Sequence, residues 1–498
     1  MFLMARDMGY RLAGMAMDPG MLLGMALIVL GVALAAYGLL PKVAHGGHDG
    51  LATIAPPEDA PLMRAHWQLM VVLSVALVID IMKPASLGFV TPGMRMEYDV
   101  GNAAVALLPF SALCGTALGS FVWGALADLY GRRASILLSS VMFIGTSICG
   151  AMPSFWWNVF MCFLMGAAAG GMLPVAYALL AEIMPTRHRG WSLVLVGGIG
   201  AIGGYFAASA LSALLQPVFG WRIMWFLNLP TGLILIVLSP FLPESARFLQ
   251  HVGRIAEARL VLAKFGAVAV PRQEIDEDAG GHAPLPPVVS GHLGTTAALT
   301  LAALSWGLVN FGLLLWLPGE LVAEGHSVGL SSAIIAKSTL FAAPVVAVST
   351  YAYSTWSTKW SLVIMIACTV AGLAGVMLRG LGIFPLLADP VVPLALLIIG
   401  STGVISMILP YTAENYPVKV RGRATGWIAG CSKIGGLMAQ GLGALALVPA
   451  IGIAAILIAI PAALSLVLIT RYGHETKGRD LRTLEGRLQT ARTISSSQ

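Results

Sequence analysis

Along most of the chain, apolar residues form continuous runs of about 20, and short polar segments separate one run from the next. A helix of that length crosses a hydrocarbon core of roughly 30 Å. The runs are continuous and do not alternate, which favours helices over a β-barrel, because a helix satisfies its own backbone polar groups in lipid. The pattern therefore predicts an all-α membrane protein that crosses the bilayer many times.

The runs predict one extra N-terminal helix, at about 20–40, and twelve core helices. The core helices are expected at about 67–90, 103–126, 134–152, 155–181, 190–215, 222–242, 296–318, 331–353, 360–379, 390–412, 424–447 and 450–470. The longest hydrophilic segment, with a short amphipathic helix near 245–265, separates two sets of six. This predicts five parts: an extension, 1–65, a six-helix bundle, 66–242, a central loop, 243–295, a second bundle, 296–470, and a basic tail, 471–498.

Composition agrees with a lipid-facing surface. Only 10% of the residues are charged, whereas a soluble protein carries about a quarter. The net charge of +6 is explained by membrane topology, so we expect no nucleic-acid partner. All five cysteines fall inside predicted spans, which disfavours a disulfide framework or a zinc site, and we expect no metal and no cofactor.

Basic residues orient the core. If the loop after residue 126 is cytoplasmic and the sides alternate, nineteen Lys and Arg of the core lie inside and three outside. This asymmetry follows the positive-inside rule and predicts a cell (inner or plasma) membrane protein with both core termini in the cytoplasm. The extra helix must then start outside, although its leader carries Arg6 and Arg11. Either that helix is weakly oriented, or translation starts downstream of it.

The two halves repeat a sequence pattern. Residues 182–190 and 414–422 share E-x-x-P-x-x-x-R-G, and the two glutamates are 232 residues apart. The pairs Gly203-Gly204 and Gly435-Gly436 follow at the same offset. Duplicated bundles are typical of transporters, in which two similar halves rock about a central site. The repeat therefore favours a transporter over an anchor or a scaffold.

Two further motifs carry a family resemblance. The loop Gly124-Ala-Leu-Ala-Asp128-Leu-Tyr-Gly131-Arg132-Arg133 resembles the signature loop of the major facilitator superfamily. The segment Pro243-Glu244-Ser245-Ala246-Arg247-Phe248-Leu249 resembles the PESPRWL-type motif of its sugar-porter and organic-ion-porter branches. The resemblance covers about residues 66–475. The equivalent loop in the second half, residues 354–360, lacks the Asp and the glycines of the signature.

The resemblance implies a conformational latch at the cytoplasmic face. Asp128 would contact the first turn of the eleventh core helix, near residues 422–424, where a helix N-terminus stabilises a carboxylate. Arg132 and Arg133 would pair with neighbouring carboxylates, or would only anchor the topology. The implied latch comprises Gly124, Asp128, Gly131, Arg132, Arg133, Glu182, Arg189, Glu244, Arg247, Glu414 and Arg421.

Ionisable residues inside predicted spans are candidates for the transport site, because burying them in a membrane is costly. Asp80 and Lys83 share one helix face at a spacing of three, so their side chains can meet. The surrounding segment, residues 80–92, resembles aromatic-acid/proton symporters and nicotinate-permease-like transporters. Other candidate substrate contacts are Lys337, Lys433, Asn310, Phe89 and Phe311. The alternatives are structural ion pairs and, for Lys337, a side chain that snorkels to water.

These residues suggest a coupling scheme. In the empty site, ionised Asp80 would pair with Lys83, and its protonation would free the lysine to hold a substrate carboxylate. The sequence thus predicts a monomeric secondary transporter that takes a small organic anion, an aromatic or other carboxylate, together with protons by alternating access. A sugar or polyol porter and a drug exporter of the same fold remain alternatives. A membrane-embedded enzyme is disfavoured because no cluster of catalytic side chains is apparent.

Overall fold

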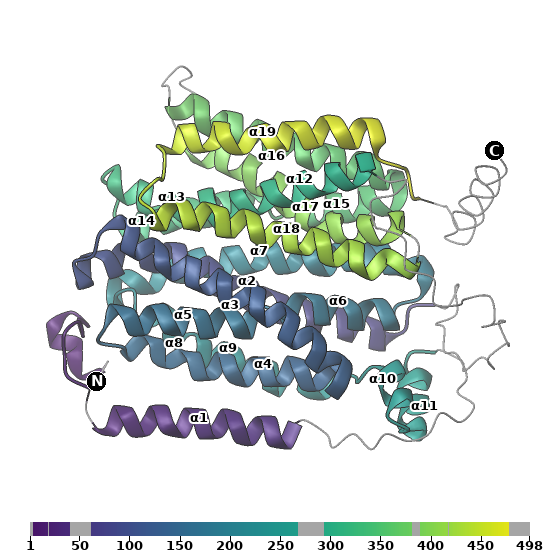
Figure 1. Ribbon diagram of the computed structural model, residues 1–498, viewed down its shortest axis with the longest axis horizontal. Coiled ribbons are helices and arrows are strands. Elements are labelled where there is room, and N and C mark those ends of the chain that lie inside the picture. Colours follow the sequence, from purple (N-terminus) through teal and green to yellow (C-terminus); the bar gives the residue numbers. More distant parts are fainter. Residues whose placement is uncertain are drawn as a thin grey trace.

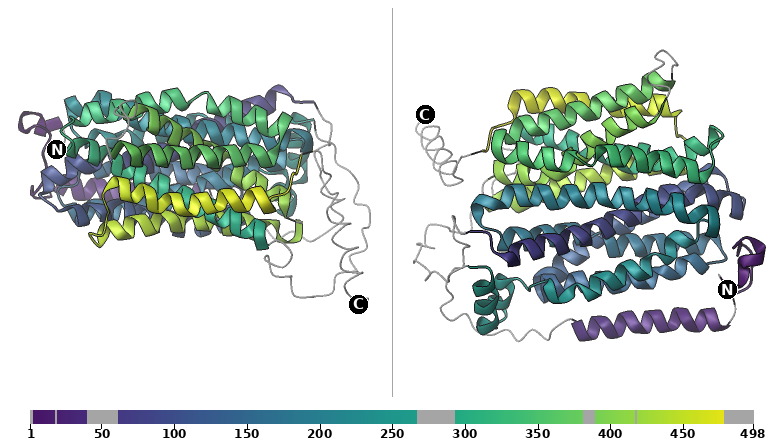
Figure 2. Two further views of the ribbon diagram at one scale, coloured as in Figure 1. Left: turned by 90° about the horizontal axis from the view of Figure 1, so that it is seen from above. Right: turned by 180° about the vertical axis from the view of Figure 1, so that it is seen from behind.

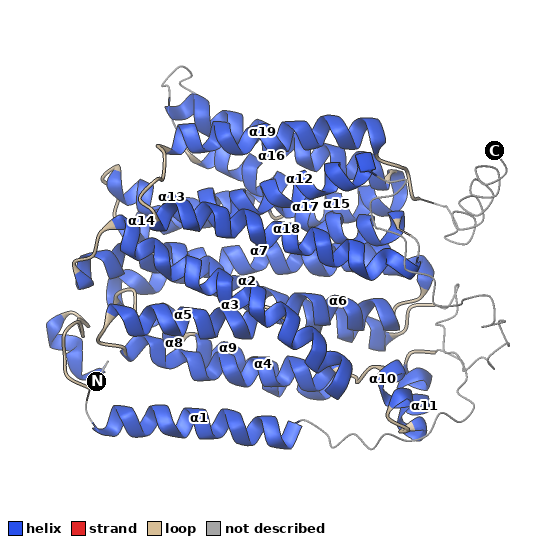
Figure 3. Ribbon diagram, viewed as in Figure 1, coloured by secondary structure: helices blue, strands red, loops and turns tan. Residues whose placement is uncertain are grey.

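The computed structural model describes residues 3–17, 19–39, 61–266, 293–380, 389–416 and 418–477. Most of the predicted central loop and tail, 267–292 and 478–498, lies outside these residues. All regular structure within them is helical, as Figure 3 shows. The predicted all-α class is therefore confirmed.

The first bundle consists of the six predicted core helices, three of them interrupted. They are α2 (Arg64–Tyr98), α3 (Asn102–Tyr130), α4 (Arg132–Thr146) with η2 (Ser147–Ala151), α5 (Phe155–Ala169) with α6 (Met172–Ile183), α7 (Thr186–Phe219), and α8 (Ile223–Phe226) with α9 (Asn228–Val237). Several helices extend beyond the apolar runs, because polar residues at their ends continue the helix into the interfacial region.

The second bundle has the same order of elements. Its helices are α12 (Leu293–Leu308) with η5 (Val309–Leu313) and α13 (Leu314–Ala323), α14 (Val328–Ala342) with α15 (Val345–Tyr351) and η6 (Ala352–Trp356), α16 (Thr358–Gly380), α17 (Val391–Asn415), α18 (Val418–Ala444) and α19 (Ile451–Tyr472). Among the described residues, eleven helices, α1 included, are long and apolar enough to span a bilayer. The pair α8–α9 and the more polar α18 complete the two sets of six.

The helices lie side by side, with the first bundle in the lower part of Figure 1 and the second in the upper part. We call the end that carries Gly131 and Glu244 the motif face. The opposite end, beside η1 (Leu3–Met8), is the leader face. The two ends are well separated in the views of Figures 1 and 2.

The extra helix and the amphipathic segment are both present. Helix α1 (Pro19–Leu39) packs against α4, where Ile28 lies beside Gly145. The single amphipathic helix predicted near 245–265 is two helices, α10 (Ala246–His251) and α11 (Ile255–Lys264). Gly253, with a φ of 79°, separates them, because this left-handed conformation ends a helix.

Close packing of α7 against α2 determines the surroundings of Asp80 in the first bundle. Helix α7 approaches α2 at Gly204, where an added Cβ would lie 2.8 Å from the carbonyl oxygen of Val78. This contact falls on the turn of α2 that carries Asp80. A side chain larger than hydrogen at Gly204 would push the two helices apart, so the glycine fixes the surroundings of the carboxylate.

Candidate functional site

Asp80 lies near the middle of α2 and is 6% exposed. Its Oδ1 atom is buried without a hydrogen-bond partner, and no described residue donates a hydrogen bond to the carboxylate. An ionised carboxylate in such surroundings is costly unless an opposite charge lies nearby. The side chain is therefore sensitive to the position of any neighbouring cation.

Lys83 is not that direct partner. Its ammonium donates hydrogen bonds to Asn228 Oδ1 at 2.8 Å and Thr231 Oγ1 at 3.1 Å, and it lies 4.6 Å from the centre of the Phe143 ring. Within the described residues, it forms no ion pair with Asp80. The spacing along α2 is as predicted, but the long side chain extends toward α9, where two oxygens satisfy it.

Lys433, on α18 of the other half, also lies within electrostatic range of Asp80. Its side chain is partly exposed, and its ammonium lies 5.0 Å from the centre of the Phe311 ring. Such a contact with an aromatic face is favourable for a cation. The carboxylate and the lysine thus come from different bundles, so the interaction between them depends on how the bundles sit together.

The other candidates are placed as follows. Asn310 donates to Ser401 Oγ and to the carbonyl oxygen of Trp306, and the Phe311 ring lies 5.6 Å from that of Trp306. Of these residues, Phe311 lies against Lys433. Phe89 is buried against Tyr205, nearer the leader face.

Lys337 is exposed on α14, on the same face as Leu340 and Phe341. The structure therefore does not bring Lys337 to Asp80, and its placement favours a side chain that snorkels to water.

At the motif face, Glu244 holds the start of α4. Its carboxylate accepts the backbone N–H groups of Arg132 at 2.7 Å and Arg133 at 3.3 Å, a favourable place for negative charge. Ser245 donates to Glu182, which also pairs with Arg132 at 3.0 Å. Burial raises the pKa of Glu244, although these backbone donors and the Arg132 charge oppose that shift. We call this arrangement the first clamp.

The second bundle repeats the clamp with residues that the sequence motifs did not identify. Glu475 accepts from the backbone N–H of Thr358 at 3.0 Å, at the start of α16, and from its hydroxyl at 2.6 Å. Thr476 donates to Glu414 at 2.6 Å, and Tyr353 donates to the same carboxylate at 2.9 Å. The pair Glu475-Thr476 lies 231 residues after Glu244-Ser245, one residue from the repeat offset of 232, so a search that allows a shift of one would have found it.

The predicted contact of Asp128 with α18 is not formed in this conformation. Asp128 is 75% exposed and pairs with Arg132 at 3.3 Å. Leu113, Phe121, Gly124 and Asp128 lie along one side of α3, which we call the α3 stripe. Leu113 packs near Gly436 of α18. Farther along the stripe, Phe121 is exposed, and an added Cβ at Gly124 would meet nothing within 4 Å. The two bundles therefore meet along this stripe near the leader face and separate toward the motif face.

The remaining latch candidates also lie at the motif face. Gly131 precedes α4 with a φ of 104°, a conformation that favours glycine, and lies against Glu244. Arg189 lies in the first turn of α7, and Glu414 lies beside the neighbouring Gly190. The side chains of Arg247 and Arg421 lie outside the described residues.

Two equivalent six-helix bundles that lie side by side form the architecture of a membrane transporter. The chain matches the model of the Major Facilitator Superfamily over residues 73–440. It belongs to that superfamily. It is therefore a multi-pass transporter of a small molecule and not an enzyme.

Curated relatives and solved structures agree with this family. The chain is 25% identical over 404 residues to the niacin transporter NiaP of Acinetobacter baylyi, covering 77% of this chain and 87% of the relative. It is 27% identical over 412 residues to the 4-hydroxybenzoate transporter PcaK of Pseudomonas putida, covering 77% of this chain and 87% of the relative. It is also 27% identical over 371 residues to a gentisate transporter of Corynebacterium glutamicum, covering 74% of this chain and 78% of the relative. Its fold is similar to that of the proton:xylose symporter XylE, with a TM-score of 0.68, 16% identity, and coverage of 84% of this chain and 98% of that one.

The second clamp predicts the effect of Glu475→Gln. Burial alone would raise the pKa of Glu475, but hydrogen bonds from Ser357, Thr358 and the Lys477 backbone lower it to about 2. The charge therefore stabilises the folded state fully above the pKa of free Glu, about 4.3, and is lost only as the pH falls toward 2. Glu475→Gln should speed hydrogen exchange at the amides of Thr358 and Lys477 by about three- to tenfold.

The control for this test is Glu257→Gln on α11, which removes an exposed pair with Arg254 and should leave both amides unchanged. In the wild-type protein, protection of the two amides should stay constant between pH 8 and 5 after correction for intrinsic exchange. Protection that falls over this range would mean that another group holds the segment.

Proposed function

We propose that the protein is a symporter that carries an organic anion with an aromatic ring and a carboxyl group together with protons. The relatives named above are transporters of niacin, 4-hydroxybenzoate and gentisate, and each of these is a ring that bears a carboxyl group. A central lysine beside an aromatic ring suits both parts of such a substrate. A sugar or a polyol would leave Lys433 without a counter-charge when Asp80 is protonated.

The proposal rests on one observation: a buried carboxylate without hydrogen bonds lies within electrostatic range of a lysine of the other bundle. In the empty site, ionised Asp80 attracts Lys433. Protonation of Asp80 removes this attraction, and Lys433 then holds the substrate carboxylate, with Phe311 against the ring. Proton and anion bind cooperatively, which is what coupled transport requires. Lys433 takes the part that the sequence assigned to Lys83, because Lys83 is already hydrogen-bonded within its own bundle.

The structure fits a state that is open to the cytoplasm. The excess of basic residues assigns the motif face to the cytoplasm and the leader face to the outside. Near the leader face, the bundles are joined by hydrogen bonds from Tyr205 to the carbonyl oxygen of Leu314 at 3.0 Å and between Ser212 and Ser332 at 2.8 Å. Alternating access would break these bonds and close the gap beside α3. The site is complete within one chain, so we propose a monomer.

Asp80→Asn should abolish accumulation of an aromatic carboxylate under an imposed pH gradient, because asparagine imitates the protonated acid permanently. Binding and exchange of the carboxylate should persist, since Lys433 remains free. The measurement is uptake of labelled 4-hydroxybenzoate and niacin into proteoliposomes, with xylose and a cationic drug as alternative solutes. Asp99→Asn, at an exposed position after α2, is the control and should behave as wild type. Accumulation by Asp80→Asn at the wild-type rate would remove Asp80 from the coupling.

The two lysines are distinguished by matched substitutions. Lys433→Gln should raise the KM for the carboxylate by about ten- to a hundredfold, the worth of a charged hydrogen bond. Lys83→Gln should instead lower the melting temperature in detergent, because Asn228 and Thr231 lose their donor, and should change KM little. If Lys83→Gln raised KM as strongly as Lys433→Gln, the original pairing of Asp80 with Lys83 would be the better scheme.

The latch is proposed for the state that is closed to the cytoplasm, in which Asp128 would reach the N-terminus of α18. Because this contact contributes about 0.3–1 kcal/mol, Asp128→Ala should shift the population about two- to fivefold toward the open state. The measurement is the rate at which a thiol reagent modifies Phe121→Cys on the exposed stripe of α3. Asp99→Ala is the control. An unchanged rate would mean that Asp128 serves only its pair with Arg132.

A further inference from the structure

The N-terminal leader is fixed to the external end of the first bundle. The backbone N–H groups of Leu12 and Ala13 donate to Glu97 Oε1 at 2.7 and 3.0 Å, and the N–H of Gly14 donates to the carbonyl oxygen of Pro153 at 3.1 Å. Leu12 is buried, and the ring of Tyr10 lies 5.9 Å from that of Phe219. The residues on both sides of Arg11 are therefore held in place.

The charge of Glu97 is already compensated. Arg222 lies 2.7 Å from Glu97 Oε1 in a buried ion pair, and Trp221 donates to Oε2 at 2.7 Å. Arg222 also donates to the carbonyl oxygens of Gly150 and Met152. Glu97 thus ties the leader to this buried network and has no charge left for a further cation.

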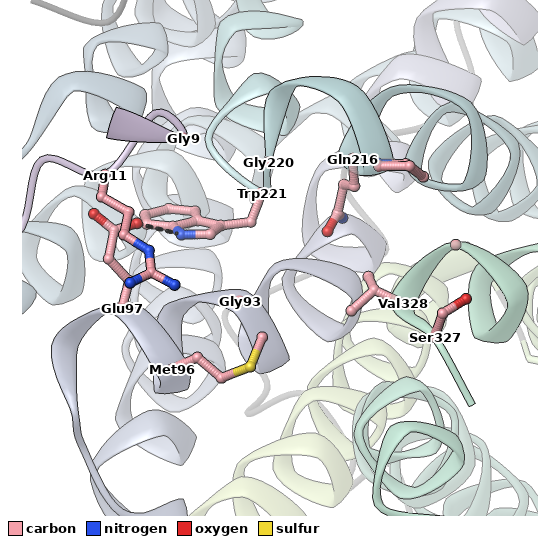
Figure 4. A pocket seen from close by; sticks show the side chains of 12 residues that line it. Gly9, Arg11, Gly93, Met96, Glu97, Gln216, Gly220, Trp221, Ser327 and Val328 are labelled. Atoms are coloured by element: carbon pink, nitrogen blue, oxygen red, sulfur yellow. Dashed lines mark hydrogen bonds between the residues drawn. The ribbon is translucent and has the colours of Figure 1, made fainter. Parts of the chain in front are cut away.

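Arg11 lines a cavity of about 340 Å³ between the two bundles. The wall from the first bundle is Gly93, Met96, Glu97, Gln216, Pro217, Gly220 and Trp221, the wall from the second is Ser327, Val328 and Gly329, and the leader adds Gly9 and Arg11. Figure 4 shows Arg11, Glu97 and Trp221 on one side and Ser327 with Val328 on the other. The volume is large enough for a small aromatic acid.

The charged groups at the cavity sum to an excess of one positive charge. Its charged lining residues are Arg11 and Glu97, and Arg222 neutralises the second of these. Arg11 is exposed and forms no ion pair with any residue in the part of the chain that the structure describes. An arginine in an external leader opposes the positive-inside rule, so its presence needs another reason.

We propose that this cavity is an external anion-binding site, in which Arg11 holds the carboxylate of the substrate before the bundles open to the outside. The identity of the ligand rests on the proposed function, whereas the preference for anions rests on the lining alone. Because the cavity has one wall on each bundle, opening the external side would connect it with the path to Lys433. The leader thus supplies a recognition residue that the twelve core helices lack at this place.

The test uses Met96→Cys, because Met96 is exposed and lines the cavity. Methanethiosulfonate reagents of similar size, one with a sulfonate and one with a trimethylammonium group, are added from outside, and the two modification rates are compared. Removing the charge with Arg11→Gln should lower the ratio of the anionic to the cationic rate by about fivefold or more. Arg11→Lys should keep most of the ratio, and benzoate should slow modification only where the cation is present.

Arg6→Gln is the matched control, because Arg6 lies on the same leader but does not line the cavity. The wild-type protein, whose five cysteines lie on the helices of the two bundles, gives the background rate. A ratio that Arg11→Gln leaves unchanged, or that Arg6→Gln lowers equally, would overturn the proposal. The assay requires no transport, so a lowered ratio in a protein that carries no carboxylate would refute the proposed substrate and retain the anion site.

Discussion

The structure depends on the cost of keeping a carboxylate without hydrogen bonds inside a membrane. Asp80 has a buried oxygen that no described residue satisfies, and Gly204 keeps α7 close to the turn that carries it. In a medium of low polarity, such a group is either protonated or compensated by a nearby cation. In the proposed scheme that cation is Lys433 of the other bundle, so the charge of Asp80 and the relative position of the bundles are linked. Any movement that separates them favours protonation, and any substrate that engages Lys433 does the same.

Such a link works only if each bundle moves as a unit, and the two clamps at the motif face account for this. In each bundle, a glutamate after the sixth helix binds the N-terminus of the third, and the following hydroxyl residue binds a glutamate at the end of the fourth. The first clamp is more buried than the second, so burial raises the pKa of Glu244 while donors lower that of Glu475 to about 2. The second clamp therefore keeps its charge at any physiological pH.

The sequence predicted the features that depend on local composition and failed where distant residues decide. Long apolar runs predicted every membrane helix, α1 included, and the repeated E-x-x-P-x-x-x-R-G motif predicted two bundles of six. The spacing of Asp80 and Lys83 placed both on α2, but α9, about 145 residues further on, determines where the lysine points. The partner lysine on α18 is more distant still. The second clamp was missed because the loop at 354–360 lacks the signature residues. The glutamate of this clamp, Glu475, lies after the last helix and contacts that loop only in the folded structure.

Arg11 in the leader, which opposes the positive-inside rule in the proposed orientation, has a physical consequence for transport. In the proposed orientation Arg11 lies outside, which is unfavourable for topology, yet Glu97, paired with buried Arg222, fixes the leader that carries it. In the proposed cycle, an anion would pass from an exposed, solvent-screened charge at Arg11 to a less exposed one at Lys433. The first site must bind weakly enough to release its ligand inward, and an exposed guanidinium meets that condition. The second binds strongly only after Asp80 takes up a proton. The two sites then set the order in which the anion is bound, and the proton gradient drives net transport.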